Sequence, residues 1–193
     1  MKRKESLTQK IVRLAIFLAL GIVLNIVESM IPLPIAIPGI RLGLANTMGL
    51  IVLYFYSPKE YIALGFLRVF LVGLLRTGLG SVAFFLSLAG WFLSTLIALG
   101  VYLAKKASIY GLSIVSAMFH QVGQMIVVMI IYQLVAMINY LPVLLVSATI
   151  SGFLVALISA KILGLLDRIF GNKNSFDEPE KSESRTKLHQ IYK

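Results

Sequence analysis

The sequence contains no cysteine, few acidic residues and none of the common nucleotide-binding motifs. Without cysteine the chain cannot form disulfides, thiolate metal sites or a thiol nucleophile. Only eight residues are Asp or Glu, and five of them lie from Asp167 onward, so the grouped carboxylates needed for magnesium-dependent diphosphate chemistry are missing. There is also no Walker A or GxGxxG motif. We therefore expect no catalytic residues, no metal, no cofactor and no nucleotide hydrolysis by this chain itself.

Charge is scarce throughout, and apolar residues are abundant. Of the 193 residues, 59% are hydrophobic and 13% are charged, with a mean hydropathy of +0.91, whereas a soluble domain carries roughly a quarter charged residues. This composition predicts an all-α integral membrane protein. The length allows about six transmembrane helices and leaves no room for a separate soluble domain. We divide the chain into a basic N-terminus (1–10), a transmembrane domain (11–166) and a polar tail (167–193).

The hydrophobic runs and their polar breaks place six helices. Prolines, glycines and short charged links separate the runs. The second and third helices are short, which suggests a recessed region rather than a uniform bundle. The predicted ranges are Ile11–Met30, Leu42–Tyr56, Tyr61–Arg76, Ser81–Ala104, Ser108–Ile138 and Val143–Leu166.

The basic residues give these helices an orientation. With six spans and the N-terminus inside, 15 of the 18 Lys and Arg residues lie in cytoplasmic segments, as the positive-inside rule requires. We therefore expect a multi-pass protein of the cell membrane with both termini in the cytoplasm. Because the net charge of +10 is explained by topology, we expect the lipid bilayer, and no nucleic acid, as a partner.

The stretch from Ile31 to Asn46, IPLPIAIPGIRLGLAN, cannot form one regular helix because it contains three prolines. Irregular backbone at membrane depth is tolerated where protein or a water-filled cavity covers it. We interpret this stretch as the outer lip of a binding cavity, with residues 31–40 acting either as a moving lid or as a fixed rim.

Charged residues within or beside the predicted helices are candidates for ligand binding, because such residues are costly in a membrane. Arg68 lies near the middle of its helix, and we favour a functional role over an ion pair or snorkelling. Arg41 and Arg76 could be interfacial anchors, but with Arg68 they form a cationic set suited to a carboxylate or phosphate. For Glu28, which shares a helix face with Asn25, we favour ion pairing with Arg41 or Arg76 over ligand contact.

Polar residues in the fifth helix form the sequence HQVGQ. His120 and Gln124 are four residues apart and face the same way. Gly123 allows a neighbouring helix or ligand to approach closely. The alternatives are ligand contact and an interhelical hydrogen bond. With Asn46, these side chains complete the predicted substrate-binding set: Arg41, Asn46, Arg68, Arg76, His120 and Gln124.

The RLGLAN segment, the helix with Arg68 and Arg76, and the HQVGQ segment together resemble the Gx transporter family, also called heptaprenyl diphosphate synthase component I. In helix five, Gln121 stands where members of that family more often carry Asn. The family is similar in size and layout to the substrate-binding (S) components of energy-coupling-factor transporters. In those proteins an AxxxA face on helix one docks the transmembrane coupling subunit, and Ala15 and Ala19 match it here.

The resemblance implies two possible functions. One is an S-component-like subunit that captures a small anionic molecule from outside, with the coupling subunit and ATPase subunits as partners. The other is a non-catalytic membrane component associated with heptaprenyl diphosphate synthesis or with quinone or flavin metabolism.

Overall fold

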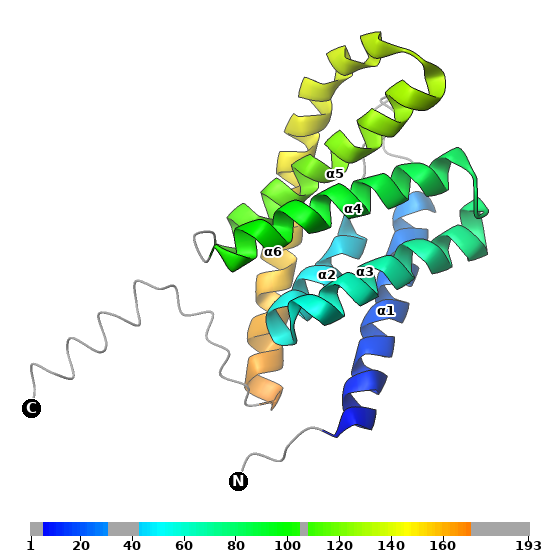
Figure 1. Ribbon diagram of the computed structural model, residues 1–193. Helices are drawn as coiled ribbons and strands as arrows, with labels where there is room; N and C mark the ends of the chain where they lie inside the picture. The colour runs from blue at the N-terminus through cyan, green and yellow to red at the C-terminus, as the bar shows by residue number, and fades with distance from the viewer. Residues whose placement is uncertain (1–5, 31–42, 105–107, 171–193) are drawn as a thin grey trace, which may run out of the picture.

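The protein, seen in a computed structural model, is built from helices throughout residues 6–30, 43–104 and 108–170, which the structure describes. No strand occurs in these ranges, so the all-α prediction is confirmed for them. The start of α1 and the end of α6 lie at the same end of the bundle (Figure 1). The elements are α1 (Leu7–Met30), α2 (Leu44–Phe55), α3 (Pro58–Val72), the π-helical turn η1 (Gly73–Thr77), α4 (Val82–Leu103), α5 (Ile109–Tyr132), the 3-10 helix η2 (Val135–Tyr140) and α6 (Leu141–Phe170).

Helix α2 is the central element of the bundle. It contacts α1, α3 and α6, and nine of its twelve residues are buried. At 1.5 Å per residue it is about 18 Å long, which is shorter than the roughly 30 Å hydrocarbon core of a bilayer. The prediction that this helix is short is therefore confirmed, and α2 is even shorter than the sequence suggested.

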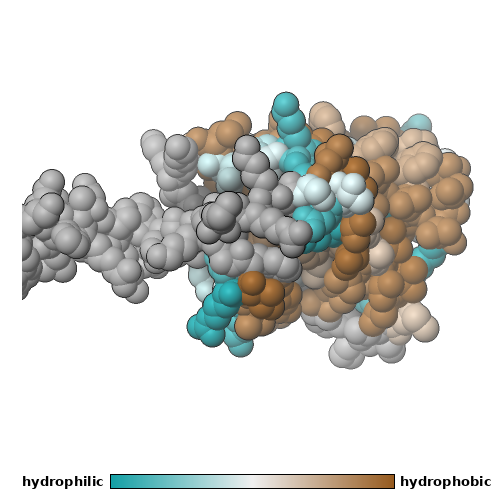
Figure 2. All heavy atoms as spheres, turned by 90° about the horizontal axis from the view of Figure 1, so that it is seen from below, coloured by the Kyte–Doolittle hydropathy of each residue, from teal (hydrophilic) through white to brown (hydrophobic). Residues whose placement is uncertain are grey.

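The outside of the bundle is apolar, as expected for a membrane protein. Four stretches are long and apolar enough to cross a membrane: α1, α4, α5 and Val135–Ile169. Large hydrophobic side chains such as Val146 and Ile150 are exposed on these helices. Seen from the end where α1 begins, hydrophobic residues cover much of the surface, and hydrophilic ones are confined to small areas (Figure 2). The protein is therefore a membrane protein, while the count of six spans and the side of each terminus stay predictions.

The observed starts of α2 and α3 differ from the predicted ones because of the residues at the N-terminal ends of these helices. Gly43 adopts a left-handed conformation (φ 73°), which an L side chain rarely takes, so α2 begins at Leu44 rather than Leu42. Helix α3 begins at Pro58, three residues earlier than predicted, because proline suits the first turn of a helix. It continues through η1 to Thr77, so the third helical segment is not short.

The later boundaries differ more. Helix α5 ends at Tyr132 rather than Ile138, because Gln133 turns left-handed (φ 52°) and the chain then forms η2. Helix α6 begins at Leu141, since Pro142 is tolerated in a first turn. It runs to Phe170, just before Gly171, so the first four residues of the predicted tail, 167–170, are helical. The rest of the tail lies outside the described residues.

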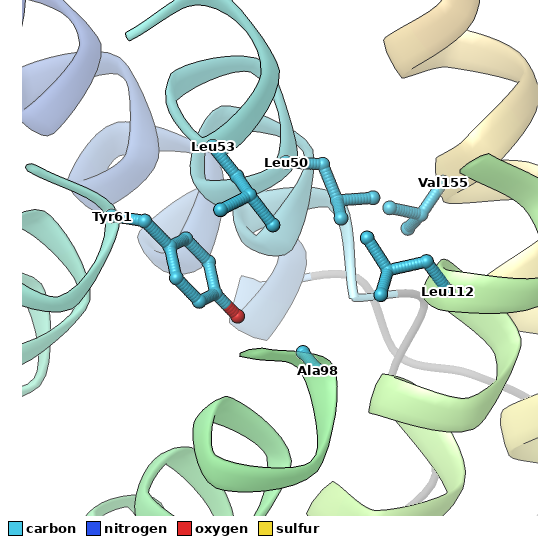
Figure 3. Close-up of a cluster of buried hydrophobic side chains, with 6 residues drawn as sticks. All are labelled: Leu50, Leu53, Tyr61, Ala98, Leu112 and Val155. Carbon is cyan, nitrogen blue, oxygen red and sulfur yellow. The ribbon is translucent and has the colours of Figure 1, made fainter. Parts of the chain in front are cut away.

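The hydrophobic core joins helices that are far apart in the sequence. Figure 3 shows side chains from α2, α3, α4, α5 and α6 meeting around one point. Leu50, Leu53, Tyr61, Ala98, Leu112 and Val155 form this cluster. Three of them, Leu50, Tyr61 and Val155, also line the central cavity described below. The cluster therefore adjoins that cavity.

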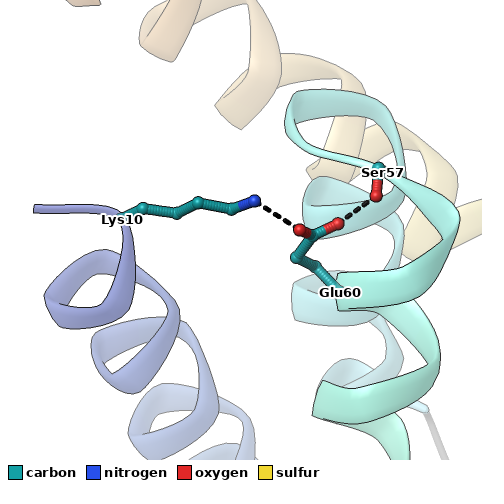
Figure 4. A network of polar contacts seen from close by, with 3 residues as sticks. All are labelled: Lys10, Ser57 and Glu60. Atoms are coloured by element: carbon teal, nitrogen blue, oxygen red, sulfur yellow. Dashed lines mark hydrogen bonds and ion pairs between the residues drawn. The ribbon is translucent and has the colours of Figure 1, made fainter. Parts of the chain in front are cut away.

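A polar contact ties the first turn of α1 to the first turn of α3. Lys10 forms an ion pair with one carboxylate oxygen of Glu60, and the Ser57 hydroxyl donates to the other oxygen (Figure 4). These hydrogen bonds, with Lys10 first and Ser57 second, lower the pKa of Glu60 from 4.5 to about 2. The contact fixes the spacing of two helices that both line the cavity.

Because this contact is partly exposed, we expect Glu60→Gln to cost less than about 1 kcal/mol of stability. The folded-state pKa of Glu60 is depressed, so its contribution is present above the ordinary carboxyl pKa and is lost as the pH falls through about 2. Thermal unfolding followed by circular dichroism should show the same small difference between variant and parent at pH 5 and at pH 8. A difference that vanishes between those two pH values would contradict this assignment.

Candidate binding site

A cavity of about 110 Å³ lies inside the bundle and is lined by residues from all six α-helices and from η1. Its size compares with about 150 Å³ for a cavity that admits benzene. It accepts a compact molecule, or one group of a larger molecule. Its walls combine buried charge, amide and hydroxyl groups and aromatic rings, which is the mixture typical of small-molecule sites.

Arg68 is the buried cation of this cavity. It lies on α3 with 8% of its surface exposed. One guanidinium nitrogen donates to the Ala45 carbonyl oxygen (2.5 Å) and the other terminal nitrogen donates to Asn46 Oδ1 (2.9 Å). Two of the five guanidinium donors are therefore used by α2. Within the described residues the other N–H groups make no further hydrogen bond, and Arg68 lines the cavity.

Glu28 is the buried anion on the same side of the bundle. Only 7% of it is exposed, and its carboxylate accepts a hydrogen bond from the Gly43 backbone N–H (2.5 Å). Glu28 thus caps the first turn of α2 from the neighbouring helix, where a negative charge is favourable. Among the described residues Arg76 forms no ion pair with Glu28. Arg41 lies outside those residues, so the ion pair with Arg41 stays a prediction.

The HQVGQ segment lines the cavity from α5. The amide nitrogen of Gln124 lies 3.2 Å from Nε2 of His120, so the two side chains share a face, as their spacing predicts. Gln121 is buried and also lines the cavity. A Cβ added at Gly123 would lie 2.6 Å from the Ala89 carbonyl oxygen. The predicted close approach of a neighbouring helix at Gly123 is therefore confirmed, and that neighbour is α4.

The structure brings most of the predicted residues together. Asn46, Arg68, His120 and Gln124 line the cavity, as does Glu28. Arg76 instead lies on η1, is exposed, and does not line the cavity.

Two predicted features lie elsewhere. Arg41 and the segment 31–40 lie outside the described residues, so a lid or rim stays a prediction. Ala15 and Ala19 are exposed on α1 and face away from the cavity.

The cavity also contains residues that were not predicted from the sequence to bind a ligand. Aromatic side chains contribute from α3 and α4, and serine hydroxyls come from α4, α5 and α6. Trp91 could have been found, because it is the single tryptophan of the chain, placed mid-helix beside Gly90. The other members have no such signal, since serine and tyrosine are common in membrane helices. These residues are Tyr61, Phe84, Trp91, Ser94, Ser113 and Ser151.

Comparison with protein families matches residues 17–162, most of the chain, to the family described as heptaprenyl diphosphate synthase component I. This confirms the family resemblance seen in the sequence. Comparison with curated proteins and with solved structures gave no match.

Proposed function

We propose a capture function for this chain, which belongs to the heptaprenyl diphosphate synthase component I family. It is a membrane-embedded, S-component-like subunit that binds a compact anionic molecule from outside the cell. Arg68 receives the anion, while Asn46, His120 and Gln124 orient the rest of the molecule. Partner subunits supply ATP hydrolysis, and both termini of this chain face the cytoplasm.

The observation that carries this proposal is the buried guanidinium of Arg68. A charged side chain inside a membrane protein is costly and is usually functional. Arg68 is anchored by α2 through two hydrogen bonds, so its position is fixed before a ligand arrives. The remaining N–H groups of a planar guanidinium suit a carboxylate or phosphate oxygen pair. Preorganisation of this kind favours binding because little ordering remains to be done.

The outer face of α1 is the proposed docking surface for the coupling subunit. Ala15 and Ala19 are exposed and one turn apart, so they present small side chains to a neighbouring helix. We expect Ala15→Leu and Ala19→Leu to remove at least nine tenths of the coupling and ATPase subunits that co-purify with the tagged protein, because the larger side chain prevents close helix contact. Co-purification is measured by quantitative mass spectrometry of detergent extracts.

A matched control is Val146→Leu, which enlarges an exposed side chain on α6. It should leave both co-purification and folding unchanged. Undiminished recovery of the ATPase subunits with the α1 variants would remove the docking assignment. Failure of the unmodified protein to recover any ATPase would overturn the transport function itself.

The family description favours a second function, that of a non-catalytic membrane component in prenyl diphosphate synthesis. The cavity supports this function less well. The cavity, at about 110 Å³, is smaller than the roughly 150 Å³ of a cavity that admits benzene. A seven-unit prenyl chain is far larger than this cavity. Among the described lining residues the charged side chains are one Arg and one Glu, whereas a diphosphate calls for several cations. Co-purification of a soluble prenyl synthase instead of ATPase subunits would favour this second function.

A further inference from the structure

Besides the Thr77 hydroxyl, two cavity-lining side chains each hold a buried polar atom that lacks a partner in the described structure. One is Nε1 of Trp91 on α4, and the other is Oδ1 of Asn25 on α1. Buried polar atoms in native proteins are nearly always hydrogen-bonded, and an unsatisfied one costs about 1–3 kcal/mol. Because both residues line the same cavity, its occupant is the group best placed to satisfy them.

The Trp91 donor cannot be satisfied locally in the way a hydroxyl can. The other partnerless atoms in the described residues are hydroxyls of Thr47, Thr77, Thr95 and Ser159, which can rotate toward the carbonyl one turn earlier in their own helix. The indole N–H of Trp91 is held on a rigid ring rather than on a short hydroxyl arm, so this local hydrogen bond is not open to it. Its edge lies against Gly65 of α3, where an added Cβ would overlap Nε1, and its ring packs on Phe66 with centroids 5.7 Å apart.

The two atoms have opposite hydrogen-bonding character. The indole N–H only donates, while Oδ1 of Asn25 only accepts. Arg68 adds further donors and Glu28 adds an anion on the same cavity wall. Arg68 and Glu28 balance each other in charge, so the described lining carries no excess of cationic side chains. A ligand made only of acceptors, such as a fully ionised diphosphate, would leave Asn25 without a partner and would face the Glu28 carboxylate.

From these four groups we infer that the ligand is a compact polar molecule that carries both an acceptor and a donor. Its single anionic group meets Arg68, an acceptor oxygen or nitrogen receives the Trp91 N–H, and an N–H or O–H group donates to Asn25. Trp91 and Asn25 are thus specificity-determining residues of the capture site. This inference rests on the proposed function and narrows its substrate class.

The test uses the full chain, immobilised in detergent and incubated with a deproteinised polar small-molecule extract of the cells that make it. After washing, retained molecules are identified by mass spectrometry, and their exchangeable hydrogens are counted from the mass gain in D₂O. We expect one retained species with at least one exchangeable hydrogen. Its retention should fall at least tenfold in Trp91→Phe, which keeps the ring but removes the donor, and in Asn25→Leu. Phe92→Tyr is the control, because Phe92 is exposed beside Trp91 and lies outside this cavity.

Thermal unfolding separates binding from folding. Trp91→Phe removes a partnerless donor, so the washed, empty protein should be at least as stable as the parent. If Trp91 had only a structural role, Trp91→Phe would instead lower the stability of the protein and leave the retention of the small molecule unchanged. Because Trp91 is the single tryptophan of the chain, its emission should also shift when the retained fraction is added back.

The outcomes are distinguishable. Retention that is lost in Arg68→Ala but unchanged in Trp91→Phe and Asn25→Leu would overturn this inference and leave the capture function standing. A retained molecule without exchangeable hydrogens would do the same. Retention of nothing by the unmodified protein would overturn the capture function and this inference with it.

Discussion

Replacing Arg68 with Ala should reduce the small-molecule occupancy of the purified protein at least a hundredfold. The substitution removes the buried cation that meets the ligand, and a charge-assisted pair of hydrogen bonds contributes about 3 kcal/mol or more when desolvated. It also leaves the Ala45 carbonyl and the Asn46 side chain without their donor. We therefore expect stability to fall too, by about 2–4 kcal/mol. Native mass spectrometry measures the occupancy, and circular dichroism measures the unfolding temperature.

Three further variants distinguish the effect of the charge of residue 68 from that of its planar guanidinium, and effects on binding from effects on stability. Arg68→Lys keeps the charge but loses the planar fork, so it should restore part of the stability and little of the occupancy. Arg168→Ala removes an exposed arginine at the end of α6 and should change neither. Arg76→Ala should also bind normally, because the structure places Arg76 on the exposed side of η1, although the sequence grouped it with Arg68. Full small-molecule occupancy in Arg68→Ala would contradict the proposal that Arg68 binds the ligand.

Some parts of this site follow from the sequence because helical spacing and membrane energetics determine them. His120 and Gln124 had to share a face, and an arginine in the middle of an apolar helix had to be buried or paired. Their common location with Asn46 and Glu28 could not be derived in this way. It depends on α2 lying at the centre of the bundle, which is a matter of helix packing that spacing alone does not reveal.

Some helix ends could likewise be predicted from the sequence, and others could not. Pro58 and the serines that cap α4 and α5 obey local rules that a sequence carries. The end of α5 does not, because Gln133 adopts a left-handed conformation that normally favours glycine. The predicted fifth helix therefore ended at Ile138, six residues beyond the observed end of α5 at Tyr132.

Replacing Gly123 with Ala should be among the most damaging single changes outside the ligand contacts. The added Cβ would lie 2.6 Å from the Ala89 carbonyl oxygen, 3.0 Å from its carbonyl carbon and 3.1 Å from the Gly90 Cα. All three atoms belong to the backbone of α4, so no flexible side chain can give way. Helix α4 must move outward, at a cost of about 1–3 kcal/mol for an overpacked contact. The unfolding temperature should fall accordingly.

The same displacement should weaken binding, because the α4–α5 contact positions His120. A Cβ added at Gly90 would lie 2.8 Å from the His120 ring, so these two glycines together bring the helices close enough to hold that ring at the cavity wall. The matched controls are Gly100→Ala on α4 and Gly164→Ala on α6, where an added Cβ meets no atom within 4 Å. Each control should stabilise the helix by about 0.5–1 kcal/mol, since alanine is the better helix former. If Gly123→Ala instead behaves like these two controls, α4 and α5 do not approach as closely in the membrane as the cavity requires, and His120 would lose its place in the binding site.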